Sequence, residues 1–115
     1  MAKMAPSAKE RRRLAEIVAE LGELGFCLPG TLTERRTRCS TPGCHCRAEP
    51  PALHGPYYSW TRKIKGKTVT RTLSAEQASR YGPWFEDARR LRALAAELEA
   101  LSLGIAEQVE GWGEK

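Results

Sequence analysis

The chain has 115 residues, of which 29% are charged and 41% hydrophobic, and its formal net charge is +5. This size predicts a single domain, residues 1–115, and this composition excludes an intrinsically disordered chain. No apolar run approaches the roughly 20 residues that cross a bilayer, and no apolar segment follows the basic start, so we expect a cytoplasmic protein without a membrane partner.

The basic excess lies in the middle of the chain. Residues 31–73 carry nine basic and two acidic side chains, whereas residues 74–115 carry five and eight. Three of the four cysteines also fall in the middle segment. In reducing cytosol, cysteines are more often metal ligands or free thiols than disulfides, so the middle segment is the first place to look for a binding site.

A first helix is predicted over residues 7–24. Ser7 and Glu10 have the spacing of a capping box, in which each side chain bonds to the backbone amide of the other residue. Apolar residues then recur at helical spacing. Gly25 is the expected stop, and Pro29-Gly30 closes the segment.

Residues 30–73 predict a small three-stranded antiparallel sheet, with a first strand in "GTLTERRTRC" and a hairpin in "YYSWTRKIKGKTVTRTL". A two-residue turn at Lys65-Gly66 pairs Ile64 with Lys67 and Trp60 with Arg71. This register gathers the apolar residues of both strands on one face and the threonines on the other. A three-residue loop would place the two apolar sets on opposite faces, so the two-residue turn is favoured.

Residues 74–110 predict two helices. Ser74 and Gln77 form a second capping box that opens a short helix, and Gly82-Pro83 ends or bends it. A long helix then runs over about 83–109, and residues 111–115 form a frayed tail. The fold class is therefore α+β: an N-terminal helix, a sheet with a metal-stapled loop, a short helix and a long C-terminal helix. The long helix carries an apolar stripe for packing or interaction: Trp84, Leu91, Leu94, Leu98, Leu101 and Ile105.

The loop between the first two strands concentrates potential metal ligands. The spacing Cys39-x4-Cys44-x-Cys46, followed by His54, supplies three thiolates and one imidazole, which is a common set for one structural Zn²⁺ ion. His45 is expected to point away. Cys27 is an alternative to His54, although it reads better as a buried thiol at the end of the first helix. An iron–sulfur cluster is less favoured than zinc because of the histidine and the basic surroundings.

These motifs resemble a family of small prokaryotic proteins that share the pattern G-x-L-x-x-R…C-x4-C-x-C…H-G-P-Y. The resemblance covers about residues 30–100 and is most specific in the cysteine loop. It implies a zinc site made of Cys39, Cys44, Cys46 and His54, and it implies no particular activity.

The basic residues of the sheet predict contact with the phosphates of DNA or RNA, since clustered cations release counterions when they bind them. These residues are Arg35, Arg36, Arg38, Arg47, Arg62, Lys63, Lys65, Lys67 and Arg71. Tyr57, Tyr58 and Trp60 can stack on bases if they are exposed. Three alternatives stay open. In the first, the basic residues form only a solvated sheet face; in the second, Trp60 packs in the core; in the third, the arginines pair with the acidic C-terminal helix.

The sequence thus favours a zinc-binding, nucleic-acid-binding accessory protein. No catalytic triad, phosphate-binding loop or carboxylate cluster suited to two metal ions is found, so we do not expect an enzyme. The alternative is a protein–protein interaction module, a homodimer or a component of a larger nucleoprotein complex, that docks through its C-terminal helix. Salt-dependent binding would distinguish the first from the second.

Overall fold

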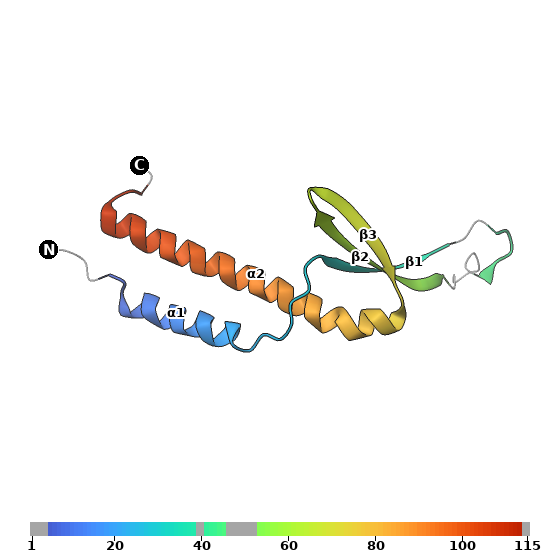
Figure 1. Cartoon of the computed structure of the whole chain (residues 1–115), viewed down its shortest axis with the longest axis horizontal. Helices are drawn as coiled ribbons and strands as arrows, with labels where there is room; N and C mark the ends of the chain where they lie inside the picture. Colours follow the sequence, from blue (N-terminus) through green and yellow to red (C-terminus); the bar gives the residue numbers. More distant parts are fainter. Residues whose placement is uncertain (1–4, 39–40, 46–52, 114–115) are drawn as a thin grey trace. The chain divides into compact units, whose positions relative to one another are not determined.

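The computed structural model describes residues 5–38, 41–45 and 53–113, and its fold is α+β (Figure 1). The elements in chain order are α1 (Ala8–Leu21), β1 (Thr31–Thr37), β2 (His54–Ile64), β3 (Lys67–Leu73) and α2 (Ala75–Glu110). They divide into two compact units, one of Met1–Cys27 with Asp87–Lys115 and one of Leu28–Glu86. Among the described residues, no helix combines the length and the apolar character needed to span a membrane.

Helix α1 begins where the sequence predicts and ends one turn earlier. Ser7 caps it: the Glu10 amide donates to Ser7 Oγ at 3.1 Å, and the Ser7 amide donates to Glu10 Oε1 at 2.7 Å. After Leu21, the amides of Glu23 and Leu24 donate to carbonyls three residues back, which ends the α-helical pattern. The expected stop, Gly25, instead donates its amide to Asp87 Oδ2 at 2.8 Å.

In the first unit, α1 runs antiparallel to the C-terminal part of α2 (Figure 1). Arg13 forms two hydrogen bonds with the Glu97 carboxylate, from Nε at 2.5 Å and from Nη2 at 2.6 Å. Nearer the other end of α1, Glu20 lies 3.8 Å from Arg90. Ile17 is fully buried, and Leu94 is 6% exposed. A small apolar core flanked by ion pairs therefore joins the two helices.

The hydrogen bonds from Arg13 hold the pKa of the Glu97 carboxyl below its ordinary value. A carboxyl with a lowered pKa in the folded state stabilises the fold above its unfolded pKa, roughly 4.3, and loses that contribution as the pH falls through the folded value. We therefore expect Glu97→Gln to lower the thermal midpoint at pH 7 and to make progressively less difference below about pH 4. Thermal unfolding from pH 7 to pH 3 measures this, with Glu99→Gln as the exposed control. A constant difference across that range would contradict the prediction.

The hairpin has the predicted register. Cα partners in β2 and β3 include Tyr58 with Leu73, Trp60 with Arg71 and Ile64 with Lys67. Lys65 and Gly66 form the two-residue turn, with positive φ values of 51° and 82°, as a type I′ turn requires. β1 pairs with the other side of β2 in the antiparallel order β1-β2-β3. The predicted meander of three strands is confirmed.

The two faces of the sheet differ in composition, because side chains alternate along each strand and paired residues share a face. The helix face consists of Leu32, Glu34, Tyr58, Trp60, Arg62, Ile64, Lys67, Val69, Arg71 and Leu73. The threonine face consists of Thr31, Thr33, Arg35, Tyr57, Ser59, Thr61, Lys63, Thr68, Thr70 and Thr72. On the helix face, Trp60 packs edge-on against Phe85 of α2, with ring centroids 5.8 Å apart.

The prediction of two helices after the sheet is wrong, because α2 continues through Pro83 as one helix. An interior proline removes a backbone hydrogen bond and costs about 3 kcal/mol. Phe85, 4% exposed, and Ala78, 6% exposed, lie on either side of it and are buried in the second unit. Burial of a phenylalanine side chain contributes about 1.5–3 kcal/mol. Packing against the sheet therefore offsets the cost of the proline and keeps the helix continuous.

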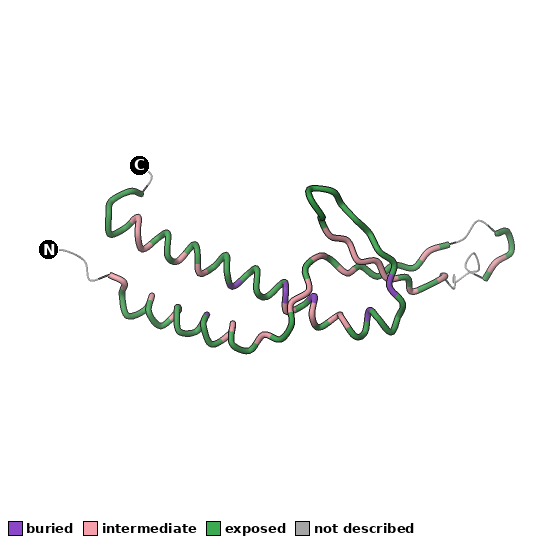
Figure 2. Tube along the Cα trace, viewed as in Figure 1, coloured by how far each residue is buried: buried purple, intermediate pink, exposed green. Residues whose placement is uncertain are grey.

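The apolar stripe of α2 is largely covered within the chain (Figure 2). Leu94 is buried, Leu98, Leu101 and Ile105 are half-buried, and Leu91 is 39% exposed. The helix ends at Gly111, whose φ is 72°, and the Trp112 amide donates to the Glu107 carbonyl at 3.0 Å. The start of the predicted frayed tail thus forms a hydrogen-bonded helix stop.

Candidate functional site

A cysteine and two histidines meet where the β1–β2 loop enters the sheet. Cys44 Sγ lies 3.2 Å from His54 Nε2 and 3.8 Å from His45 Nδ1. The ligand atoms of these three residues all lie within 4.8 Å of one another. Cys44 and His54 are half-buried and His45 is exposed, so the cluster lies at the surface.

These distances suit a shared metal ion. In a tetrahedral zinc site, with Zn–S of about 2.3 Å and Zn–N of about 2.0–2.1 Å, sulfur and nitrogen ligand atoms are about 3.5 Å apart. The two separations from Cys44 Sγ fall on either side of this value. One thiolate with imidazoles is also the borderline-soft donor set that Zn²⁺ prefers. The three described residues therefore fit a zinc ion, with one position left in a four-coordinate shell.

The backbone around His54 explains how the chain brings it to the cluster. His54 pairs with Thr37 at the end of β1. Immediately before this pair, the register between β1 and β2 shifts between Arg35 and Thr37. Gly55 stands beside it with φ of 121°, and a Cβ there would lie 3.0 Å from the Arg35 carbonyl oxygen. Only glycine fits this close approach without strain. The irregularity thus lies where the β1–β2 loop ends and β2 begins.

Cys44, the second member of the cluster, follows a tight turn in the β1–β2 loop. The Cys44 amide donates to the Thr41 carbonyl at 3.3 Å, and Gly43 has φ of 75°. Pro42 and Gly43 therefore turn the chain sharply just before Cys44. This turn precedes Cys44, whose Sγ lies close to His54 Nε2 at the start of β2.

The predicted ligands have different outcomes. Cys44 and His54 are brought together, whereas Cys39 and Cys46 lie outside the described residues. The expectation that His45 points away is wrong: its ring also lies 5.0 Å from that of His54, centroid to centroid. In an extended segment, side chains alternate, so His45 would point away from its neighbours Cys44 and Cys46. Residues 42–45 are not extended but form a turn. Cys27 belongs to the other compact unit and contacts the Gly25 carbonyl.

The basic residues of the sheet fall into three groups. Arg47 lies outside the described residues, and Arg62 stacks over Trp60 at 4.3 Å from the ring centre. The remaining seven are exposed: Arg35, Arg36, Arg38, Lys63, Lys65, Lys67 and Arg71. Within the described ranges, none of these seven has an ion pair with a carboxylate.

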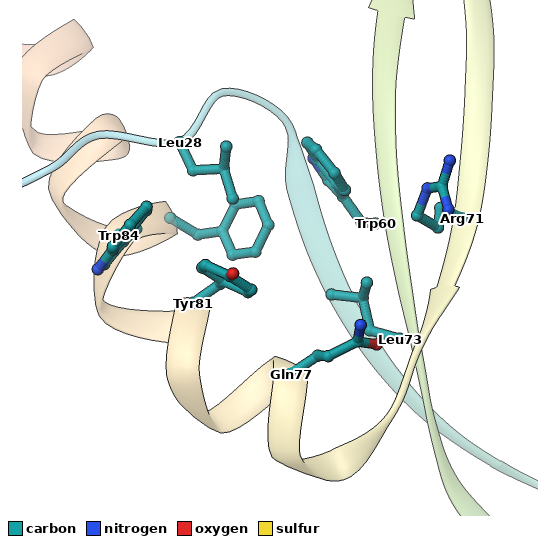
Figure 3. A pocket seen from close by; sticks show the side chains of 8 residues that line it. Leu28, Trp60, Arg71, Leu73, Gln77, Tyr81 and Trp84 are labelled. Carbon is teal, nitrogen blue, oxygen red and sulfur yellow. The ribbon is translucent and has the colours of Figure 1, made fainter.

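A cavity of about 290 Å³ separates part of the helix face from α2, and it fixes the role of Trp60 (Figure 3). The indole forms one wall, with Leu73, Tyr81 and Trp84 among the others. Trp60 Nε1 donates to the Pro29 carbonyl at 2.9 Å. Trp60 is therefore a packing residue, as one of the alternatives proposes, and Trp84 lines this cavity rather than an interaction stripe.

The cysteine–histidine cluster and the hairpin tip lie at opposite ends of the sheet. β2 begins at His54 and ends at Ile64, and an 11-residue strand is about 35 Å long at 3.2–3.4 Å per residue. Arg35, Arg36 and Arg38 accordingly lie toward the cluster, and Lys65 lies in the distal turn. A metal ion in this cluster would organise the β1–β2 loop and could not touch the tip.

Fold and site together define a small α+β protein with a cysteine–histidine cluster at one end of a basic three-stranded meander. A family model described as Domain of unknown function (DUF6788) matches residues 7–82, so the chain belongs to that family. The match includes α1, which lies outside the range of the sequence resemblance. No curated protein and no solved structure matches the chain.

Proposed function

We propose that this protein binds nucleic acid through its basic sheet and that one structural zinc ion holds the β1–β2 loop. The observation that carries the proposal is the state of the hairpin tip, where Lys63, Lys65 and Lys67 are all exposed and unpaired among the described residues (Figure 2). Unneutralised cations at the end of a β-ribbon suit contact with phosphates, because their binding releases condensed counterions.

For the metal we propose Cys44 and His54 as ligands, together with Cys39 and Cys46 as the spacing predicts. The zinc ion would supply a cross-link between the loop and the start of β2. With four protein ligands no coordination position remains for a catalytic water, so the role is structural. His45 competes with the outer cysteines for a place in the shell, since its Nδ1 is near Cys44 Sγ.

The test is a titration of labelled single-stranded and duplex DNA and RNA into the purified protein at several salt concentrations. We expect affinity to fall steeply with salt, with a slope of log K against log salt of about −0.7 to −0.9 per phosphate contacted. A solvated sheet without a ligand would give no binding at the lowest salt. That result would reject the nucleic-acid proposal.

Docking through the end of α2 is a second candidate function. Val109 is 56% exposed and follows Ile105 at helical spacing, and Trp112, just beyond the end of α2, is 69% exposed. These two side chains offer a partner protein an apolar contact at the end of α2. A protein that only docks would show no salt-dependent affinity in the titration described above.

A further inference from the structure

The threonine face of the sheet has an unusual composition for a surface of this size. Eight of its ten residues are exposed, and only Ser59 and Thr61 are half-buried. It carries hydroxyl groups, two cations and one phenol ring, and it contains neither a carboxylate nor an aliphatic side chain. Glu34, the one acidic residue of the three strands, belongs to the helix face. The face is thus uniformly suited to a polar, anionic ligand.

Tyr57 is the one aromatic residue on this face. It is 44% exposed, and within the described residues its side chain has no ring contact and no hydrogen bond. Its Cα partner in β1 is Arg35, so an accessible ring and a guanidinium stand side by side. The other strand aromatics, Tyr58 and Trp60, belong to the helix face. An exposed ring beside a cation is the arrangement that lets a base stack while its phosphate is neutralised.

Hydroxyl groups and a second cation extend this pair along β2. Ser59, Thr61 and Lys63 follow Tyr57 at every second residue, which spans about 20 Å. The Thr61 and Thr70 hydroxyls lie 3.3 Å apart across β2 and β3. Hydroxyl donors of this kind can contact phosphate and sugar oxygens. The row therefore offers a track for a strand backbone that starts at a stacking platform.

We infer that the threonine face binds single-stranded nucleic acid, with Tyr57 stacking on a base and Arg35 and Lys63 contacting phosphates; this inference rests on the proposed function. A single strand is favoured over a duplex because stacking on Tyr57 needs a base whose ring face is accessible. In a duplex, the bases are stacked on each other, and contact with the sheet is restricted to the backbone and groove edges.

The experiment measures fluorescence anisotropy of labelled single strands of about 12 nucleotides, within the 4–16 nucleotides that comparable sheet platforms occupy, and of the matching duplex. Three variants are compared with the wild type: Tyr57→Leu, Tyr57→Phe and Lys63→Thr. We expect Tyr57→Leu to weaken single-strand binding about five- to tenfold with an unchanged salt slope, since stacking carries no charge. Tyr57→Phe keeps the ring and should bind within about twofold of the wild type.

Two further measurements distinguish failure of this inference from failure of the proposed function: the affinity for the duplex, and the affinity of the Lys63→Thr variant. Lys63→Thr should weaken both single-strand and duplex binding and reduce the salt slope by about one. If Tyr57→Leu binds single strands as the wild type does, or loses affinity equally for duplex, the stacking inference is overturned while nucleic-acid binding stands. If the wild type binds neither form at low salt, the proposed function fails as well. Circular dichroism checks that each variant is folded.

Discussion

Replacement of Cys44 by serine is expected to abolish stoichiometric zinc binding. We expect the wild type to contain about one zinc per chain, because apparent binding free energies of structural zinc sites reach about 10–16 kcal/mol. Loss of a thiolate that lies 3.2 Å from His54 Nε2 removes a ligand common to every set considered above. Metal analysis by mass spectrometry of both proteins, purified in parallel, measures the change.

Cys27→Ser is the matched control for this variant. Cys27 is also half-buried, but it belongs to the unit of α1 and bonds to the Gly25 carbonyl. The same thiol-to-hydroxyl change at this position should therefore leave the zinc content unchanged. A wild type without metal, or a Cys44→Ser variant that keeps its full zinc content, would contradict the proposed site. Iron with visible absorbance would replace the structural role with a redox one.

The consequence of zinc loss for folding follows from where the cores lie. Ile17 and Leu94 are buried in one unit and Leu73 and Phe85 in the other, and none of them belongs to the loop. Chelation should therefore leave most of the helical signal intact. It should lower the protection of backbone amides near Thr37 and His54, whose pairing ends the sheet beside the cluster.

Two further variants, His45→Ala and Cys46→Ser, test which residues complete the zinc shell around Cys44 and His54. The structure brings His45 near Cys44, whereas the spacing favours Cys39 and Cys46. If the thiolates complete the shell, His45→Ala keeps one zinc per chain and Cys46→Ser loses it or weakens it at least tenfold. The reverse pattern would assign the position to His45.

The parts of this fold that the sequence predicts well are those in which local signals agree. The hairpin register follows from side-chain parity and from the Lys65-Gly66 turn, since a three-residue loop would split the apolar residues between two faces. The capping box at Ser7 and Glu10 likewise needs only four adjacent residues.

The parts that it predicts poorly depend on contacts between distant residues. Pro83 is a strong local stop signal, and burial of Phe85 against the sheet overrides it. Gly25, the stop that the sequence predicts for α1, lies after the helix end and donates its amide to Asp87, 62 residues away. For the site, spacing identified Cys44 and His54, but the position of His45 follows from the turn at Pro42-Gly43 and could not be read from alternation.

Removal of the three hairpin lysines is expected to have the largest effect on nucleic-acid affinity. The variant Lys63→Thr, Lys65→Asn, Lys67→Thr retains the hairpin, because threonine favours strands and Asn-Gly is a strong type I′ turn at the positive φ of residue 65. Three lost phosphate contacts should reduce the slope of log K against log salt by about 2–3, and the affinity about 100-fold at roughly 0.1 M salt. Binding titrations at several salt concentrations measure both quantities.

A control of equal charge distinguishes a local site from a general effect of net charge. Lys9, Arg11 and Arg12 are exposed on α1, and none has an ion pair among the described residues. Their joint replacement by glutamine also removes three positive charges, but from the compact unit that does not contain the sheet. Equal losses in the two triple variants would mean that net charge alone attracts nucleic acid. A loss restricted to the hairpin variant would place the phosphate contacts at the tip, because screening at 0.1 M salt limits the reach of exposed charges to about 10 Å.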